Sequence, residues 1–203
     1  RLPFWIVDVF AARLLEGNPA AVVFGGETLD GAAMQAIARE TNLSETVFVL
    51  PSDRSGADYR VRIFTPRREL PFAGHPTIAA AFAWRRFRGR AEAALVQSCG
   101  AGLIPVACET HEGREIFVMT QPGPQVRATG LSPEDAAALI GCPRAALTDG
   151  PIEIVSTGVP WLLVGLSARE ALAALRPNLV AIEAASAGLG ADGVIAYAPG
   201  APG

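Results

Sequence analysis

Apolar and polar positions in the first third of the chain follow the pattern of short strands separated by turns. The runs at 4–10, 20–24 and 46–50 are rich in β-branched and aromatic residues, which favour extended backbone. Turn residues at 17–19 separate the first two runs. At 59–65, apolar and basic residues alternate, so the apolar ones share one face of a strand. These segments predict a sheet.

Two helices are expected in the same region, and their patterns differ. One begins at Thr28 and runs over 28–40, with apolar residues at helical spacing. The other covers 76–86, and its seven residues at 78–84, IAAAFAW, are all apolar. A helix without a polar face has to be buried on every side. We therefore expect strands to wrap around this second helix.

The segment QPGPQ at 121–125 is the best domain boundary, because two prolines flank a glycine there. The division predicts one domain over 1–120 and another over 126–203. In the second domain, Ser132 and Pro133 carry the signals of a helix N-cap and first helical position. A further helix is expected before Pro177, and strands are expected at 152–157, 161–166 and 193–197.

A short internal repeat links the two domains. Gly17-Asn18-Pro19 and Gly158-Val159-Pro160 each lie between two strand-like runs. Gly74 follows Gly17 by 57 residues, so the matching turn of the second copy is expected near position 215, after residue 203. On this interpretation the second domain is incomplete and lacks its own central helix, which would leave an exposed apolar sheet.

Composition narrows the function classes. The chain has 203 residues, of which 50% are hydrophobic, and 17 basic against 20 acidic side chains give a net charge of −3. This balance favours neither nucleic acid nor an anionic membrane as partner. The three cysteines are odd in number and widely spaced, as in reduced cytoplasmic proteins. With two histidines, no cluster at zinc-ligand spacing exists, and no metal is expected.

Gly74-His75-Pro76 is the first candidate site, because it directly precedes the apolar helix. We expect His75 at the N-cap and Pro76 at the first helical position, where its missing N–H costs nothing. The free N–H groups and the dipole of a helix N-terminus suit a carboxylate or phosphate, and Gly74 leaves room for close approach. The alternative is a structural turn in which His75 only caps the helix.

Glu45, in the stretch Thr41–Thr46, is the second candidate. In the strand that follows, Val47 and Val49 share the face of Glu45, so its carboxylate is expected to point where buried residues point. Partial burial removes water from a carboxylate and suits it to proton transfer. The alternative is a loop glutamate in solvent.

Three stretches together resemble the PhzF-like family of isomerases, named for an enzyme of phenazine biosynthesis. They read DVFAARLLEGNPAAVVF, MQAIARETNLSETVFVLP and RIFTPRRELPFAGHPTIAAAFAW, and they cover most of residues 7–84 in order. The later text STGVPWLLVGL and GADGVIAYAP resembles the second half of the family more loosely.

The resemblance implies an α+β fold like that of diaminopimelate epimerase, with two similar domains. Each is a curved, mostly antiparallel sheet around a central helix, and the active site lies in the cleft between them. It also implies that no metal or organic cofactor is used and that the protein is a homodimer, as in many members. Glu45 is the implied general acid/base, Gly74 and His75 the implied substrate-binding turn, and Asn18 an implied residue at the rim.

The implied reaction is proton transfer at carbon of a small carboxylate such as a dihydro-hydroxyanthranilate. Family members also carry an Asp-Pro-x-Thr-Gly-Ser-Ala turn, which does not occur in these 203 residues. Two alternatives therefore stay open. One is a non-catalytic chain that binds a small acid or a partner protein, and the other is an amino-acid racemase or epimerase.

Overall fold

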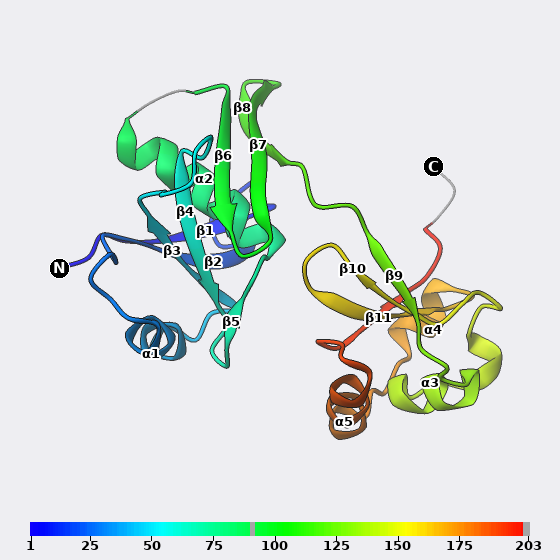
Figure 1. Ribbon diagram of the computed structural model, residues 1–203. Coiled ribbons are helices and arrows are strands. Elements are labelled where there is room, and N and C mark those ends of the chain that lie inside the picture. The colour runs from blue at the N-terminus through cyan, green and yellow to red at the C-terminus, as the bar shows by residue number, and fades with distance from the viewer. Residues whose placement is uncertain (90–91, 201–203) are drawn as a thin grey trace. The chain divides into compact units, whose positions relative to one another are not determined.

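The chain divides into two units, Arg1–Pro122 and Gly123–Gly203, in the computed structural model (Figure 1). The structure describes residues 1–89 and 92–200, so positions 90, 91 and 201–203 of the two expected domains lie outside the described residues.

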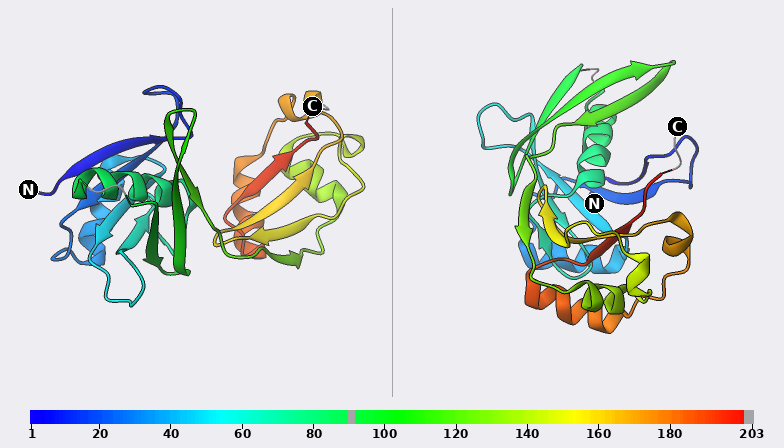
Figure 2. Two further views of the ribbon diagram at one scale, coloured as in Figure 1. Left: turned by 90° about the horizontal axis from the view of Figure 1, so that it is seen from above. Right: turned by 90° about the vertical axis from the view of Figure 1, so that its right-hand side faces the viewer.

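The first unit contains eight strands and two helices within its described residues: β1 (Phe4–Val9), β2 (Asn18–Phe24), α1 (Gly31–Thr41), β3 (Glu45–Leu50), β4 (Tyr59–Phe64), β5 (Glu69–Leu70), α2 (Gly74–Arg88), β6 (Ala94–Cys99), β7 (Gly102–His111) and β8 (Arg114–Met119). The strands form one sheet in the order β1-β2-β3-β4-β6-β7-β8, with β5 paired to β4. This sheet curls around α2 as a half-barrel (Figure 2). The fold is therefore the expected mixed α+β architecture.

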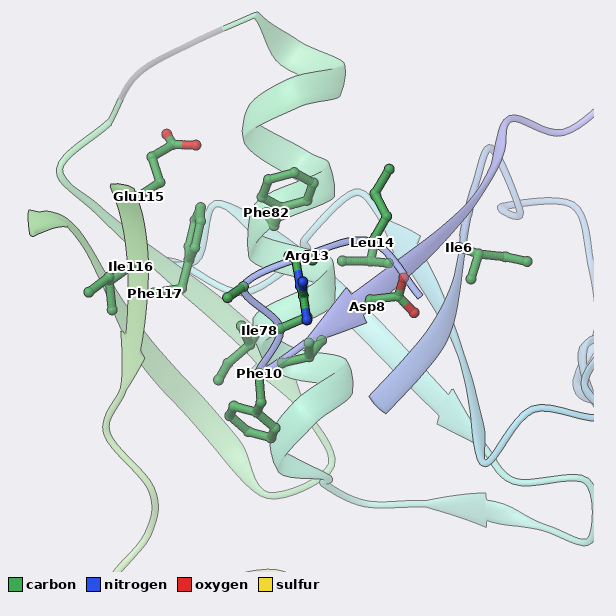
Figure 3. A pocket seen from close by; sticks show the side chains of 14 residues that line it. Ile6, Asp8, Phe10, Arg13, Leu14, Ile78, Phe82, Glu115, Ile116 and Phe117 are labelled. Carbon is green, nitrogen blue, oxygen red and sulfur yellow. The ribbon is translucent and has the colours of Figure 1, made fainter. Parts of the chain in front are cut away.

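Helix α2 is buried less completely than its sequence predicts. Its alanines at 79, 80, 81 and 83 are fully buried, and their small side chains let the sheet approach closely. Ile78, Phe82 and Trp84 are only half-buried. Strands β1 and β8 are the two edges of the half-barrel, and a groove of about 540 Å³ lies between them, lined by Ile78 and Phe82 of the helix (Figure 3). The open edge explains why Ile78 and Phe82 are only half-buried.

Helix α1 covers the outer face of β2, β3 and β4 and crosses over between the parallel strands β2 and β3. It begins at Gly31, three residues later than predicted, because Asp30 and not Thr28 is the N-cap. The Asp30 carboxylate accepts a hydrogen bond of 2.8 Å from the backbone N–H of Ala33. On the sheet, Phe48 meets Phe64 edge to face, and both are buried under the helix.

Gly17 precedes β2 at a point where the backbone leaves no room for a side chain. A Cβ at this position would lie 2.5 Å from the Val9 carbonyl oxygen and 2.9 Å from the Ala11 Cβ. Because the first of these neighbours is backbone, it cannot rotate away. We expect Gly17→Ala to lower the free energy of unfolding by about 1–3 kcal/mol in urea denaturation. Gly123→Ala is the matched control, since a Cβ there meets nothing within 4 Å. Equal stability of the two variants would contradict the prediction.

The second unit contains β9 (Gln125–Ala128), α3 (Pro133–Ile140), the 3₁₀ turn η1 (Arg144–Ala146), β10 (Glu153–Ser156), β11 (Pro160–Gly165), α4 (Arg169–Ala173), α5 (Leu179–Leu189) and β12 (Val194–Tyr197). Its sheet has the order β12-β11-β10-β9. Ser132 caps α3 as predicted. Helix α5 was not predicted, because its sequence LVAIEAASAGL shows no polar stripe. Residues of α3 and α5 pack with the sheet into one core.

The internal repeat is visible in the strand directions. Strands β10 and β11 pair antiparallel, and β12 then pairs parallel to β11, as β1, β2 and β3 do in the first unit. The register places Gly193 of the second unit where the first has Glu45, and a Cβ at Gly193 would lie 2.9 Å from the ring of Trp161. The second unit therefore repeats the strand arrangement of the first but has no carboxylate at the position of Glu45.

One face of the second sheet is apolar and partly open. Val126, Ile195 and Tyr197 alternate with residues of the helix-covered face, and all three are exposed. By the repeat, Ile195 corresponds to Val47 of the first unit, where the strand packs against α2.

Among the described residues, no helix is both long and apolar enough to cross a membrane.

Candidate active site

The stretch between α1 and β3 is built to deliver Glu45 at the start of a strand. Asn42 ends α1 in the left-handed conformation, with φ of 52°, and its N–H donates to the Ala38 carbonyl at 3.2 Å. Thr46 is fully buried, and its hydroxyl lies 2.8 Å from the Thr41 hydroxyl. This contact links the start of the strand to the end of the helix. Glu45, between these two anchors, is the first residue of β3.

The start of α2 brings His75 to the same place, although not as predicted. The helix begins at Gly74, and its N-cap is Ala73, whose backbone is extended and whose side chain makes no capping bond. The prediction of His75 as N-cap was wrong, because Pro76 fits inside the first turn and the helix can start two residues before it. His75 therefore lies in the first turn, and its ring is not used for capping.

Glu45 and His75 form a contact that is mostly shielded from solvent. The Nε2 atom of His75 lies 3.2 Å from the Oε2 atom of Glu45, and the two side chains are 10% and 17% exposed. Both atoms are buried, and neither has a hydrogen-bond partner of correct geometry among the described residues. Buried polar groups are normally satisfied, so two such atoms without a partner of correct geometry mark this pair as a candidate functional site.

The environment keeps the His75 ring neutral. Burial lowers the pKa of His75 below its ordinary value, and this effect outweighs two others that favour the protonated ring. These are the Glu45 carboxylate and a hydrogen bond with the Pro19 backbone. At neutral pH, Glu45 therefore faces a neutral imidazole and not a fixed cation.

Asn18 and Gly74 complete the set of expected residues. Strand β2 runs parallel to β3 with Ala20 opposite Glu45, and the exposed Asn18 accepts a hydrogen bond of 3.4 Å from the Ser44 hydroxyl. A Cβ at Gly74 would lie 2.9 Å from the methyl group of Met119, so the glycine allows β8 to approach the start of α2. The structure thus brings together all four predicted residues at the starts of β2, β3 and α2.

A buried chain of hydrogen bonds holds the start of α2 in place. The Gln97 amide donates to the Thr77 hydroxyl at 3.0 Å, and the Thr77 hydroxyl donates to the Ala73 carbonyl at 2.9 Å. Thr77 and Gln97 are fully buried. Sequence reasoning missed both as site-supporting residues. The sequence signal that could have identified them is a polar residue next to an apolar run: Thr77 precedes IAAAFAW, and Gln97 follows AALV.

Removal of the Thr77 hydroxyl tests this support. Thr77→Val keeps the volume but leaves the Gln97 amide and the Ala73 carbonyl without their partner, so we expect the free energy of unfolding to fall by about 1–3 kcal/mol. Urea denaturation measures the change. Thr110→Val, at an exposed position in β7, is the matched control. An unchanged stability for Thr77→Val would show that the chain of hydrogen bonds does not hold the helix.

The site is a carboxylate–imidazole pair. The three free cysteines are half-buried, and burial raises the pKa of each thiol. Within residues 1–89 and 92–200, no group of three or more His, Cys, Asp or Glu side chains could hold a metal ion. The candidate site thus offers a carboxylate, Glu45, beside a neutral hydrogen-bonding ring, His75.

Known proteins similar to this chain identify its family. The model of the phenazine biosynthesis-like family (PhzC-PhzF) matches residues 7–201. Trans-2,3-dihydro-3-hydroxyanthranilate isomerase from Pseudomonas fluorescens is 42% identical over 176 residues, and its counterpart from Pseudomonas aeruginosa is 38% identical over 174 residues. Each match covers 85% of this chain and 60% of the relative, so the chain spans about 60% of the length of these relatives.

Solved structures of similar proteins share the fold of this chain. A predicted epimerase from Pseudomonas aeruginosa has a TM-score of 0.82 at 33% identity, covering 96% of this chain and 69% of that one. A PhzF-family protein from Bacillus anthracis has a TM-score of 0.77 at 31% identity, covering 89% and 61%. A hydroxyproline epimerase from Agrobacterium vitis, at 14% identity and a TM-score of 0.54 over 73% of this chain and 48% of its own, shares the fold. The chain belongs to the phenazine biosynthesis-like (PhzC-PhzF) family.

Proposed function

We propose that this chain is the Glu45-bearing part of an isomerase that transfers a proton between carbons of a small carboxylate substrate. The observation that carries the proposal is the shielded contact of Glu45 with His75, in which each side chain has an unsatisfied buried atom. Relatives at 38–42% identity are named trans-2,3-dihydro-3-hydroxyanthranilate isomerase, which supports a dihydro-hydroxyanthranilate as the substrate.

In the proposed reaction, Glu45 is the general acid/base. Its carboxylate takes a proton from one ring carbon, and the electron pair of that C–H bond moves into the conjugated ring. The proton on the Glu45 carboxylic acid exchanges with solvent, and the acid then delivers a proton to another carbon on the same face, so one residue serves both steps. No electron is gained or lost, and the step needs no redox cofactor.

We further propose that the enzyme acts as a cytoplasmic homodimer.

The turn at Gly74 and His75 is the proposed substrate-binding element. The first N–H groups of a helix have no intrahelical partner and lie at the positive end of its dipole, which suits the substrate carboxylate. Because the His75 ring is neutral, it can hydrogen-bond the substrate without forming a permanent ion pair with Glu45. Asn18, bonded to Ser44 beside Glu45, is the proposed rim contact.

The deciding experiment is incubation with trans-2,3-dihydro-3-hydroxyanthranilate in D₂O, followed by NMR and mass spectrometry. We expect the double bonds to shift and one solvent deuterium to enter the product. The Pseudomonas fluorescens isomerase is the positive control. Deuterium exchange at the α-carbon of proline or hydroxyproline, without reaction of the anthranilate, would favour a racemase or epimerase. Binding without any exchange would leave only the non-catalytic alternative.

A further inference from the structure

Arg60 has an unusual position for a charged residue. It is half-buried, its Nε atom is buried, and that atom has no hydrogen-bond partner among the described residues. Arg62, two residues further along the same face of β4, shows the ordinary arrangement, since it forms two hydrogen bonds of 2.7 Å with Glu69. A buried guanidinium N–H without a partner is unfavourable unless an acceptor reaches it.

Two hollows meet at Arg60. One, of about 410 Å³, is lined by Asp53, Arg54, Arg60, Ser98 and Cys99. The other, of about 510 Å³, shares Arg60 and Cys99. Arg60 therefore lines both hollows, and a small ligand in either one lies next to it.

The charges around these hollows leave Arg60 uncompensated. In the second hollow, Arg62 and Glu69 neutralise each other. In the first, Arg54 and Arg60 face the single carboxylate of Asp53. Burial raises the pKa of Cys99, so its thiol stays neutral and supplies no anion. The hollow thus carries a net positive charge.

We propose that the hollow at Arg60 binds a small oxyanion, either a carboxylate or a phosphate group. Arg60 and Arg54 supply two guanidinium groups to the hollow, and Ser98, whose hydroxyl donates to the Tyr59 carbonyl, lines it as well. This site is separate from the Glu45 turn. Arg60 lies opposite Leu50, five residues along β3 from Glu45, which is about 16 Å in an extended strand.

The test is a titration of the ¹⁵N-labelled chain with sodium phosphate and, separately, with sodium acetate, at constant ionic strength. The reporters are the Arg60 Nε–H signal and the backbone amides of Cys99 and Gly100. We expect saturable shifts with a dissociation constant on the order of millimolar. Saturation by phosphate alone identifies a phosphate site, and saturation by acetate alone identifies a carboxylate site.

Variants separate a built site from a general charge effect. Arg60→Gln should weaken binding at least about tenfold, whereas Arg39→Gln, which removes the same charge at an exposed position of α1, should leave it unchanged. Arg60→Lys keeps the charge without the planar fork and should be intermediate, and it serves if Arg60→Gln does not fold. Shifts that stay linear in both salts, or that persist in Arg60→Gln, would overturn the proposal. Neither result depends on isomerase activity.

Discussion

Glu45→Gln is expected to slow solvent-deuterium uptake into the substrate by about 10²–10⁴-fold or more, while substrate still binds. The amide has nearly the shape of the carboxylate but cannot accept a proton from carbon. The measurement is the rate of deuterium incorporation by mass spectrometry, with substrate binding followed by calorimetry. Undiminished exchange would exclude Glu45 as the acid/base.

A matched control separates lost chemistry from lost charge. Glu40→Gln removes the same charge at an exposed position of α1, five residues before Glu45, and should leave deuterium uptake unchanged. The folded state of Glu45→Gln is checked by urea denaturation. We expect no loss of stability, because the Glu45 Oε2 atom has no satisfied hydrogen bond to lose. A similar loss of exchange in both variants would indicate an electrostatic effect and not proton transfer.

The candidate site residues could be proposed from the sequence because the stretches that resemble the PhzF-like family lie in short, recognisable turns. Asn18, Glu45, Gly74 and His75 come from three segments, and each segment joins a strand or helix whose pattern is clear. The parallel pairing of β2 with β3 brings two of these turns together, and α2 brings the third. What could not be predicted was the direct contact of His75 with Glu45, because it depends on where α2 begins.

Contacts between distant segments could not be predicted from the sequence. Arg60 alternates with Val61 on a strand, which predicts a solvated side chain, yet its Nε is buried among residues from distant segments. Thr77 and Gln97 are 20 positions apart, and only the fold shows that they bond. Helix α5 lacks a polar stripe, so its pattern matched neither a surface helix nor a strand. Local patterns specify elements, whereas such contacts follow from packing.

His75→Gln is expected to lower kcat/KM by about 10²-fold, because one preorganised hydrogen-bonding group facing Glu45 is displaced. Steady-state kinetics with the proposed substrate measures the effect. His111→Gln is the matched control, since His111 is the only other histidine and is exposed at the end of β7. Equal kinetics of the two variants would remove His75 from the substrate site.

The same histidine should make stability depend on pH in a defined direction. Because burial lowers the pKa of His75 in the folded protein, the unfolded chain binds more protons as the pH falls through 6.5, the ordinary value. The free energy of unfolding should therefore be highest above this pH and decrease below it. His75→Gln should flatten this decrease and His111→Gln should not.

In Glu45→Gln the carboxylate that favours protonation of His75 is gone, so the pKa of His75 should fall further, as NMR titration would show. A His75 pKa above the ordinary value in the wild-type chain would contradict the neutral imidazole on which the proposed substrate contact rests.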